Sequence, residues 1–357
     1  MKILLRSCFV LLALFICGCK HPSAPATSNS APEPPYQKPA TFDVQGSHTL
    51  GKIERLDSRL DELIAPGSKM EKLAEGFDWS EGPIWMKEGE FLLFSDVPQN
   101  VIYRWKEGQA VKEFLKPSGY TGSTPRGGEP GSNGLTVDSQ GRLVLCEHGD
   151  RRVARLERDG QKTTLADSYH GKRLNSPNDL VYHSNGDLYF TDPPYGLEGK
   201  NEDPKKELPF NGVYRLKPNG DLTLLTDKLT FPNGLAFSPD EKMLYVAVSD
   251  PARAIWMAYD VKEDGTIDHG RVFFDTTSLV KGHKGLPDGM KVDKKGNLFA
   301  TGPGGVFIFS PDGKHLGTLN TGEATANCNW GNDGSVLYIT ADMYLCRIRT
   351  KTSGAKF

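Results

Sequence analysis

The sequence has 357 residues, with 39 glycines, 24 prolines, 37% hydrophobic and 25% charged residues, which is typical of a globular protein with many turns and a large core. The net charge of −2 and the lack of a basic stripe exclude an electrostatic basis for nucleic-acid binding. After the N-terminus no run approaches 18 apolar residues, so the sequence predicts no membrane span there.

The N-terminus has the features of a processing signal. Lys2 and Arg6 precede an apolar run that ends in I-C-G-C, which resembles the bacterial lipobox that precedes a lipidated cysteine. We therefore expect a lipoprotein signal peptide over residues 1–18 and lipidation of Cys19. Residues 19–48 would form the lipidated cysteine and a flexible tether rich in Pro, Ser and Ala.

This interpretation places the protein in a bacterial cell envelope, on the periplasmic or outer-surface side, in contact with the membrane through its N-terminal lipid only. The alternative is an ordinary cleaved signal and a free periplasmic or secreted protein. Three cysteines remain after processing, Cys146, Cys328 and Cys346. Their number is odd and their spacing fits no metal site, so buried free thiols are the default, with a Cys328–Cys346 disulfide as the alternative in an oxidising compartment.

A hairpin pattern recurs along the rest of the chain. Each copy consists of two apolar runs joined by a tight turn, and most copies are followed by two more short strands. The copies cover residues 81–96, 133–148, 178–192, 233–250, 288–302 and 327–341. Four-stranded repeats at spacings of about 40–55 residues are the signature of β-propeller blades.

The sequence thus predicts an all-β fold, a six-bladed β-propeller over residues 69–357, preceded by a lead-in segment over 49–68. The last copy supplies only about three strands. Residues 69–77 precede the first copy, and we expect them to add the missing outer strand and close the ring. A jelly roll or lectin sandwich explains neither the regular period nor the repeated D-G and N-G turns.

Polar side chains stand just before the first strand of each hairpin. In a propeller this strand lines the central channel, so equivalent positions form a ring at one depth. Asn-Gly and Asp-Gly pairs are ordinary turn formers one by one, but five acceptor-bearing residues in register indicate a site. They are Glu81, Asn133, Asn178, Asn233 and Asp288, and the sixth position falls on Ala326 or Asn327, depending on a one-residue choice of register.

Two carboxylates and several amide oxygens that converge on one point suit a hard divalent cation. Ca²⁺, with its preference for about six to eight oxygen ligands, is the first choice. No His or Cys cluster has zinc spacing, which argues against a dedicated zinc site, although Mg²⁺, Mn²⁺ or Zn²⁺ on the same oxygens stays open.

The second strand of each hairpin returns to the same rim and brings further polar residues to it, among them His148 and Asp192. We expect these to form a second shell or a substrate-facing wall. Asp179 is expected to point to the opposite face from Asn178 and to serve as a structural turn residue.

Several motifs resemble the SMP-30/gluconolactonase/LRE-like family over about residues 69–350. They are EGPIW, NGL, RLNSPNDLVY, YFTDPPYG, FPNGLAFSPDE, LPDGMKVD and the NxWxxDGxxLYIT ending. The resemblance implies a six-bladed propeller that binds a divalent metal, usually calcium, in its channel.

Carried over residue by residue, the resemblance implies the metal ligands Glu81, Asn233 and Asp288, and Asp288 as the proton acceptor and donor. Asn178 would complete the metal shell or hold the substrate. An arginine that binds sugar in some relatives is replaced here by Ser176, with Arg173 nearby, so sugar recognition does not carry over directly.

The reaction that the resemblance implies is hydrolysis of a small sugar lactone. The metal would polarise the carbonyl and a channel carboxylate would relay the proton. Asp288 is the first choice for that carboxylate, with His148 or Asp192 as the second. The expected substrate-binding residues are Asn133, His148, Asn178, Asp192 and Tyr195.

Two alternatives from other classes stay open at this stage. The first is a surface-anchored propeller that binds a glycan or protein and keeps calcium for structure only, since propellers often serve as scaffolds. The second is a hydrolase of other esters or of phosphotriesters with the same metal geometry. The presence of both carboxylates, Glu81 and Asp288, in register with three asparagines favours the enzyme.

Overall fold

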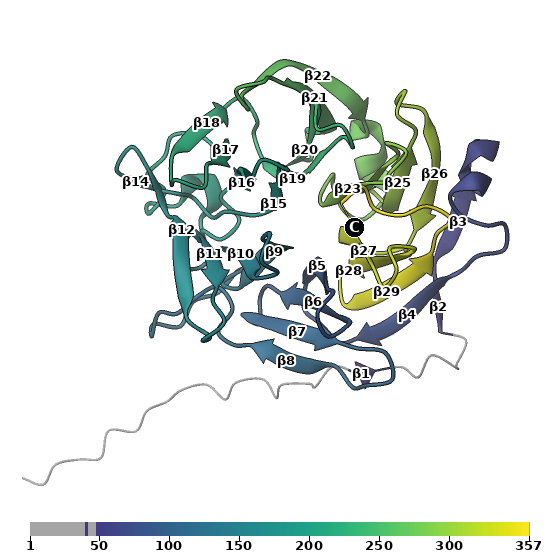
Figure 1. Cartoon of the computed structure of the whole chain (residues 1–357), viewed down its shortest axis with the longest axis horizontal. Helices are drawn as coiled ribbons and strands as arrows, with labels where there is room; N and C mark the ends of the chain where they lie inside the picture. The colour runs from purple at the N-terminus through teal and green to yellow at the C-terminus, as the bar shows by residue number, and fades with distance from the viewer. Residues whose placement is uncertain (1–39, 42–47, 357) are drawn as a thin grey trace, which may run out of the picture. The chain divides into compact units, whose positions relative to one another are not determined.

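A computed structural model describes residues 40–41 and 48–356 of the chain. Seen down its axis, the described part of the chain is a ring of six antiparallel sheets (Figure 1). The all-β, six-bladed arrangement predicted from the repeat is thus confirmed. The predicted signal peptide, Cys19 and nearly all of the tether lie outside the described residues. Among those described, no helix is long and apolar enough to cross a membrane.

The first three sheets follow the first three hairpin copies. Sheet 1 contains β5 (Ser80–Met86), β6 (Phe91–Asp96), β7 (Val101–Trp105) and β8 (Lys112–Leu115). Sheet 2 contains β9 (Ser132–Val137), β10 (Leu143–Glu147), β11 (Arg152–Leu156) and β12 (Lys162–Ala166). Sheet 3 contains β15 (Leu180–Tyr182), β16 (Leu188–Asp192), β17 (Gly212–Leu216) and β18 (Leu222–Thr226).

The other three sheets follow in the same order around the ring. Sheet 4 contains β19 (Pro232–Phe237), β20 (Met243–Asp250), β21 (Arg253–Val261) and β22 (Ile267–Asp275). Sheet 5 contains β23 (Met290–Val292), β24 (Leu298–Gly302), β25 (Gly305–Phe309), β26 (His315–Asn320) and β3 (Lys52–Arg55). Sheet 6 contains β27 (Thr325–Gly331), β28 (Val336–Ala341), β29 (Tyr344–Arg349) and β4 (Met70–Glu75), to which β1 (Ala40–Thr41) and β2 (Thr49–Leu50) also pair.

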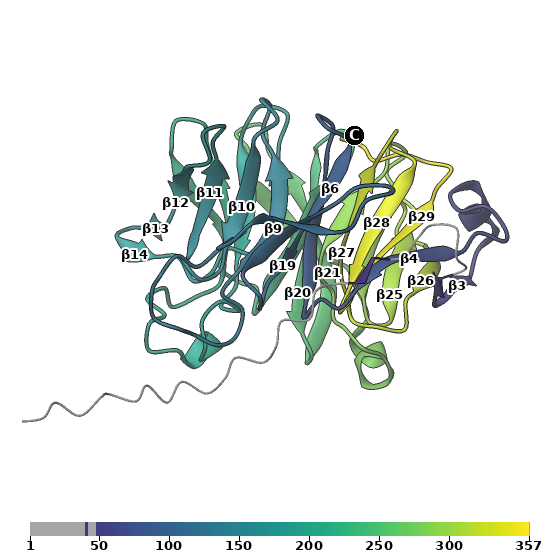
Figure 2. The same cartoon turned by 90° about the horizontal axis from the view of Figure 1, so that it is seen from below.

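The remaining elements lie in connections. A two-stranded ribbon joins β13 (Ser168–Tyr169) to β14 (Lys172–Arg173). Three 3₁₀ helices complete the structure: η1 (Ser58–Glu62), η2 (Lys200–Glu202) and η3 (Thr277–Gly282). Figure 2 shows η2 (teal) and η3 (green) on one face of the ring, opposite the face from which the C-terminus emerges.

Apolar side chains fill the spaces between neighbouring sheets. Within the described part of the chain there are six buried clusters, one for each pair of adjacent sheets. Strand alternation produces this arrangement, because successive side chains point to opposite faces. On β6, for example, Leu92 and Phe94 face sheet 6 while Leu93 faces sheet 2. Each sheet is therefore covered on both faces, and the innermost strands are left to line the channel.

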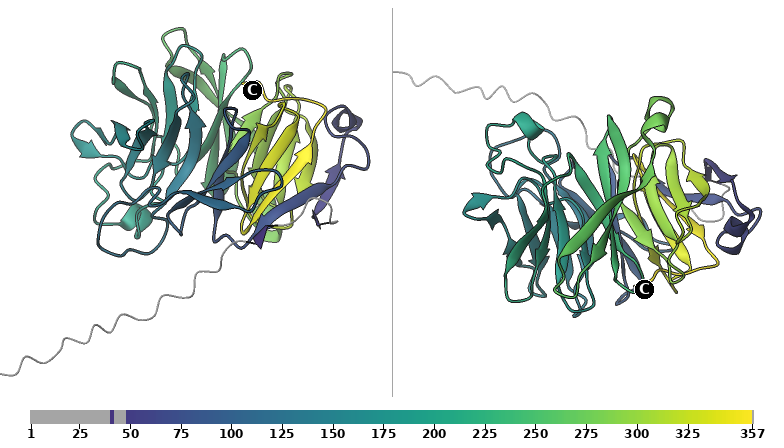
Figure 3. Two further views of the ribbon diagram at one scale, coloured as in Figure 1. Left: turned by 60° about the horizontal axis from the view of Figure 1, so that its bottom comes forward. Right: turned by 90° about the horizontal axis from the view of Figure 1, so that it is seen from above.

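The outer strand of sheet 6 comes from the N-terminal side of the chain. β4 pairs antiparallel with β29, with Ala74 opposite Leu345 and Glu71 opposite Arg347. Figure 3 shows this purple segment alongside the yellow C-terminal strands in both views. The strand lies within the 69–77 segment that the sequence assigned to this position.

The segment over 49–68 does more than lead into the first sheet. β3 pairs with β26, with Ile53 opposite Leu319, and Leu60 and Ile64 are fully buried in the cluster between sheets 5 and 6. The 49–68 segment therefore packs against sheets 5 and 6, while the domain boundary at residue 69 stays a prediction. The hairpin repeat could not predict β3, because this added edge strand belongs to no hairpin.

The three cysteines of the described residues are buried free thiols, as the default interpretation predicted. Cys146, Cys328 and Cys346 are free and buried. Cys328 and Cys346 lie on β27 and β29, and each is opposite Ile339 of the strand between them. The structure contains no Cys328–Cys346 disulfide.

The packing of β4 leads to a test of its contribution to stability. Leu73→Ala should lower the free energy of unfolding by about 2–5 kcal/mol, because Leu73 is buried against Phe94 and Tyr338 in one cluster. Leu56→Ala, at a residue 61% exposed, is the control and should change stability little. Urea unfolding of both variants measures this. Equal stabilities would mean that β4 does not pack as described.

Candidate active site

The six innermost strands approach one another most closely where most of them carry a glycine. A Cβ atom on Gly82 would lie 2.3 Å from the carbonyl oxygen of Asn133, and one on Gly234 would lie 2.3 Å from that of Asp288. A Cβ atom on Gly134 would lie 2.6 Å from the carbonyl oxygen of Asn178, and one on Gly289 would lie 2.0 Å from the side-chain Cγ of Asn327. Contacts this short exclude any side chain. Each residue that precedes such a glycine therefore stands beside its counterpart on the next sheet, and the predicted ring positions lie at one depth.

Backbone hydrogen bonds settle the register of the sixth position. Gly134 N–H donates to Asn178 O at 2.8 Å, and Gly289 N–H donates to Ala326 O, also at 2.8 Å. Ala326 is therefore the counterpart of the ring residues. Asn327 is the counterpart of the glycines, one layer deeper in the channel. The ring thus has five oxygen-bearing members and a gap at Ala326.

Four oxygen atoms of this ring are buried without a hydrogen-bond partner among the described residues. They are the Oδ1 atoms of Asn133, Asn178, Asn233 and Asp288. The three asparagines are at most 5% exposed and Asp288 is half-buried. The Asn233 amide is oriented from behind, because its Nδ2 donates to Ser249 Oγ at 2.9 Å. Buried polar atoms are nearly always paired in folded proteins, and these four oxygens are free to coordinate a ligand.

The two carboxylates of the ring have raised pKa values. Burial, and after it the charge of Asp179, raises the pKa of Glu81. Burial, followed by the charges of Glu81 and Asp179, raises the pKa of Asp288. Buried carboxylates so close together cannot all ionise without a compensating positive charge.

The donor set fits a hard divalent cation. Glu81 and Asp288 bring negative charge, and the three asparagines bring neutral oxygens, which together match the preference of calcium. No group of three or more His, Cys, Asp or Glu that could hold a metal occurs in the described part of the chain. The fit to a cation therefore depends on the amide oxygens.

One layer below the ring, two side chains meet where the other sheets have glycines. Asn327 Nδ2 donates to Glu81 Oε2 at 3.1 Å and lies 3.5 Å from Asp179 Oδ2. Lys291 Nζ lies 3.5 Å from Asn327 Oδ1. The assignment of Asp179 as a structural turn residue was wrong. It is 2% exposed and spans the channel between sheets 3 and 6, so it forms part of a floor beneath the ring. The sequence did contain an indication of this role, because four other hairpin copies have a glycine at the equivalent position.

Hydroxyl side chains at the ends of the second strands hold the ring backbone. Ser95 Oγ donates to Asn133 O at 2.9 Å, and Ser249 Oγ donates to Pro287 O. Thr301 Oγ1 lies 2.9 Å from both Gly289 O and Ala326 O. The residues predicted to return to this rim therefore do so, and they act by fixing the ring rather than by facing the channel.

Asp192, predicted to hold the substrate or to act as a base, has contacts of its own. Its Oδ2 and Oδ1 accept the backbone N–H groups of Asn175 and Ser176, each at 2.8 Å. Asp96 accepts the N–H groups of Asp78 and Trp79 in the same way in sheet 1. These carboxylates fix the segment that leads into the first strand, and a role for Asp192 in substrate binding stays a prediction.

His148 lies behind the ring rather than in the open channel. It is 0% exposed, its Nδ1 is 3.3 Å from Glu129 Oε2, and its Nε2 is 3.4 Å from Asn178 Nδ2. The imidazole of His148 therefore lies behind Asn178, and its contact with substrate stays a prediction. Glu129 was missed by the sequence reasoning. It lies in a loop outside the hairpin repeat, and its only signal was its position four residues before Asn133.

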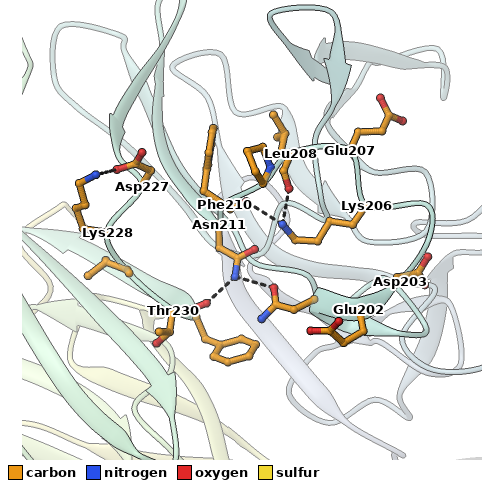
Figure 4. A pocket seen from close by; sticks show the side chains of 14 residues that line it. Glu202, Asp203, Lys206, Glu207, Leu208, Phe210, Asn211, Asp227, Lys228 and Thr230 are labelled. Atoms are coloured by element: carbon orange, nitrogen blue, oxygen red, sulfur yellow. Dashed lines mark hydrogen bonds and ion pairs between the residues drawn. The ribbon is translucent and has the colours of Figure 1, made fainter.

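Tyr195 forms part of the wall beside Asn233. Its hydroxyl is 3.5 Å from Ser249 O, and its ring stacks on Phe231 with centroids 5.8 Å apart. A cavity of about 710 Å³ also borders Phe231. Figure 4 shows its polar lining, including Asn211, which donates to Thr230 O. This cavity contains none of the ring residues.

Comparison with known proteins identifies this architecture. The model of the SMP-30/gluconolactonase/LRE-like region matches residues 79–342. The chain belongs to the SMP-30/gluconolactonase/LRE-like family. This confirms the resemblance found in the motifs, and the match contains all five ring residues.

Similarity to individual proteins of the family supports this assignment. A gluconolactonase from Zymomonas mobilis is 44% identical over 322 residues, which cover 88% of this chain and 90% of that enzyme. The structure of a gluconolactonase from Xanthomonas campestris is 34% identical, with a TM-score of 0.73 over 85% of this chain and 96% of that one. A regucalcin from Xenopus laevis is 25% identical over 75% of this chain and 85% of its own length.

The position that carries a sugar-binding arginine in some family members has another function here. Ser176 Oγ donates to Pro193 O at 2.6 Å and accepts the Gly196 N–H at 2.8 Å. Arg173 is exposed and donates to Asp150 O at 2.8 Å. Neither residue brings a guanidinium group to the ring.

Asp192 gives a pH-dependent prediction. Burial raises the pKa of Asp192 to about 7 from 3.8, so the folded state binds a proton that the unfolded state releases between these values. The stabilising contribution of Asp192 is therefore complete below about pH 3.8 and is lost as the pH rises through 7. Asp192→Asn does not titrate, so it should destabilise the protein more at pH 5 than at pH 8, by about 1–3 kcal/mol. Urea unfolding at both pH values measures this difference, and an equal or reversed difference contradicts the prediction.

Proposed function

We propose that this protein is a metal-dependent hydrolase of a sugar lactone, of the gluconolactonase type. Its family and its similarity to the Zymomonas enzyme make it a carboxylic-ester hydrolase of the lactonase class. The observation that carries the proposal of a metal is the ring of four buried, unpartnered oxygen atoms beside Glu81. Calcium is the first choice for the cation because the donors are all carboxylate or amide oxygens. Mg²⁺, Mn²⁺ and Zn²⁺ are alternatives for the same site.

The residues that would hold the cation are Glu81, Asn178, Asn233 and Asp288. When bound, the cation supplies Lewis-acid polarisation of the lactone carbonyl and stabilises negative charge on its oxygen. The floor formed by Asp179 and Asn327 lies beneath the ring. The substrate would therefore enter from the face on which the ring residues begin their strands, above Tyr195.

Asp288 is the residue we assign to proton transfer. Its Oδ1 is buried without a partner among the described residues, and it is beside the place where the carbonyl would lie. It takes a proton from the attacking water as the new C–O bond forms, and it returns a proton to the ring oxygen as the lactone C–O bond breaks. A carboxylate near a cation is a weak base, but lactones are reactive esters and need only modest assistance.

The substrate hydroxyls would contact Asn133 and Tyr195. Asn133 Oδ1 is a buried acceptor in the gap next to Glu81. Tyr195 offers an aromatic face and a hydroxyl on the side of Asn233. His148 lies behind Asn178, and Asp192 accepts two backbone N–H groups, so Asn133 and Tyr195 are the first choices.

The test of this proposal is hydrolysis of glucono-δ-lactone and other sugar lactones, corrected for spontaneous hydrolysis. The rate should fall when the metal is removed with a chelator and should return with calcium. Asp288→Asn keeps one amide oxygen for the cation but loses the proton acceptor, so kcat should fall by about 10²–10⁴-fold. Asp221→Asn, in an exposed turn, is the control.

Other outcomes would support the alternatives. Activity that does not depend on metal, or an Asp288→Asn variant as active as the unaltered protein, contradicts the mechanism. Calcium binding without activity on any lactone would support the surface-anchored scaffold that binds a glycan or protein. Activity on aryl esters or phosphotriesters alone would support the second alternative.

We also propose that a lipid on Cys19 holds the protein at a bacterial cell envelope, on the periplasmic or outer-surface side. The supporting observation is the sequence itself, in which basic residues, an apolar run and I-C-G-C precede a Pro- and Ser-rich tether. Cys19→Ser should move the protein from the membrane fraction to the soluble fraction of expressing bacteria. A variant that stays with the membrane would contradict lipidation.

A further inference from the structure

A loop over residues 116–131 joins sheet 1 to sheet 2 and is tied to the loop that follows β16. Gly127 N–H donates to Glu198 Oε1 at 3.0 Å. The Arg126 guanidinium donates to Gly196 O and, at 3.4 Å, to Gly149 O. The loop therefore connects sheets 2 and 3 next to the ring, and it carries Glu129.

Glu129 and His148 form a connected pair. Glu129 Oε2 lies 3.3 Å from His148 Nδ1, which is within ion-pair distance although Nδ1 has no hydrogen-bond partner among the described residues. His148 Nε2 lies 3.4 Å from Asn178 Nδ2. An amide nitrogen can only donate, so Nε2 must be the bare, accepting nitrogen of the imidazole. The proton then belongs on Nδ1, which is the nitrogen beside the Glu129 carboxylate. The charge of Glu129 thus favours the tautomer that Asn178 requires.

This tautomer decides which way the Asn178 amide points. With Nδ2 directed to His148, Oδ1 is on the other side, where it is buried and without a partner among the described residues. The opposite amide orientation would place an NH₂ group among the ring oxygens and would repel a cation. The amide of Asn233 is oriented by Ser249 Oγ, which accepts a hydrogen bond from Asn233 Nδ2. Ser249 Oγ is itself fixed by its hydrogen bond to Pro287 O. In sheet 3 the fixing group, His148, lies beside a residue from a separate loop, Glu129.

We propose that Glu129 and His148 are positioning residues that hold the Asn178 oxygen toward the metal and so couple the 116–131 loop to metal binding. This inference rests on the proposed function in one respect, that the ring holds a divalent cation. His148 is enclosed on both nitrogens by Glu129 and Asn178, which is the geometry of an orienting group. Asn178 is accordingly a metal ligand rather than a substrate ligand.

The first experiment measures calcium binding by isothermal titration calorimetry on the metal-free full-length protein. His148→Leu removes the acceptor for Asn178 Nδ2 and should raise the Kd by about 10–100-fold, as is typical when a residue behind a metal ligand is lost. His148→Gln, whose amide oxygen can accept the same hydrogen bond, should recover part of the affinity. Glu129→Ala should raise the Kd in the same direction. Glu113→Ala, which removes the same charge at an exposed position of β8 outside this loop, is the matched control and should bind like the unaltered protein.

The outcomes separate the two proposals. If the unaltered protein does not bind calcium or another divalent cation, the proposed metal dependence fails, and this inference fails with it. If the unaltered protein binds and both His148→Leu and Glu129→Ala bind equally well, only this inference is overturned. Should His148→Leu fail to fold, Glu129→Ala still decides, because Glu129 is on the surface with a side chain 35% exposed.

The second experiment measures the reverse coupling, which thermodynamic linkage requires. Bound calcium should protect the Arg126–Gly127 bond from trypsin in the unaltered protein, with cleavage sites identified by mass spectrometry. Protection should be lost in Glu129→Ala at a calcium concentration that saturates both proteins. Equal protection in the two proteins would overturn the coupling between loop and ring.

Discussion

The close approach of the innermost strands is the constraint on which the rest of the structure depends. Glycines at four of the six equivalent positions allow the backbone of one sheet to touch the next, with no room for a Cβ at Gly82 or Gly234. The strands can converge only where side chains are missing. As a result, the residues that precede these glycines are held beside each other, and their side chains have no direction left except toward the channel.

The close approach of the strands determines which polar groups meet at the site. It brings carboxylates and amide oxygens together in a buried place, and burial raises the pKa values of Glu81 and Asp288. Isolated buried charges are costly, which is why we propose a cation at the ring. The surrounding residues keep these oxygens in place. Ser95, Ser249 and Thr301 fix the ring backbone or amides, and Asp96 and Asp192 fix the approaching segments.

The two sheets that lack a glycine at the equivalent position make the two ends of the channel different. Asp179 and Asn327 meet across the axis below the ring and form a floor on that side. The 116–131 loop and Tyr195 lie toward the side that we propose for substrate entry. A substrate would thus meet the cation, the Asp288 carboxylate and the loop together, which is what hydrolysis of a small cyclic ester requires.

The sequence by itself determined the fold class, the number of blades and the five ring residues, because a hairpin with fixed strand alternation and fixed turn residues repeats visibly along the chain. The repeat could not show the edge strand β3, which belongs to no hairpin, or the loop residue Glu129. Nor could it determine where side chains point across the axis. Asp179 became part of the floor, while Asp192 and His148 turned to backbone or side-chain partners. Those outcomes depend on contacts between residues far apart in sequence, and only the tertiary structure brings such residues together.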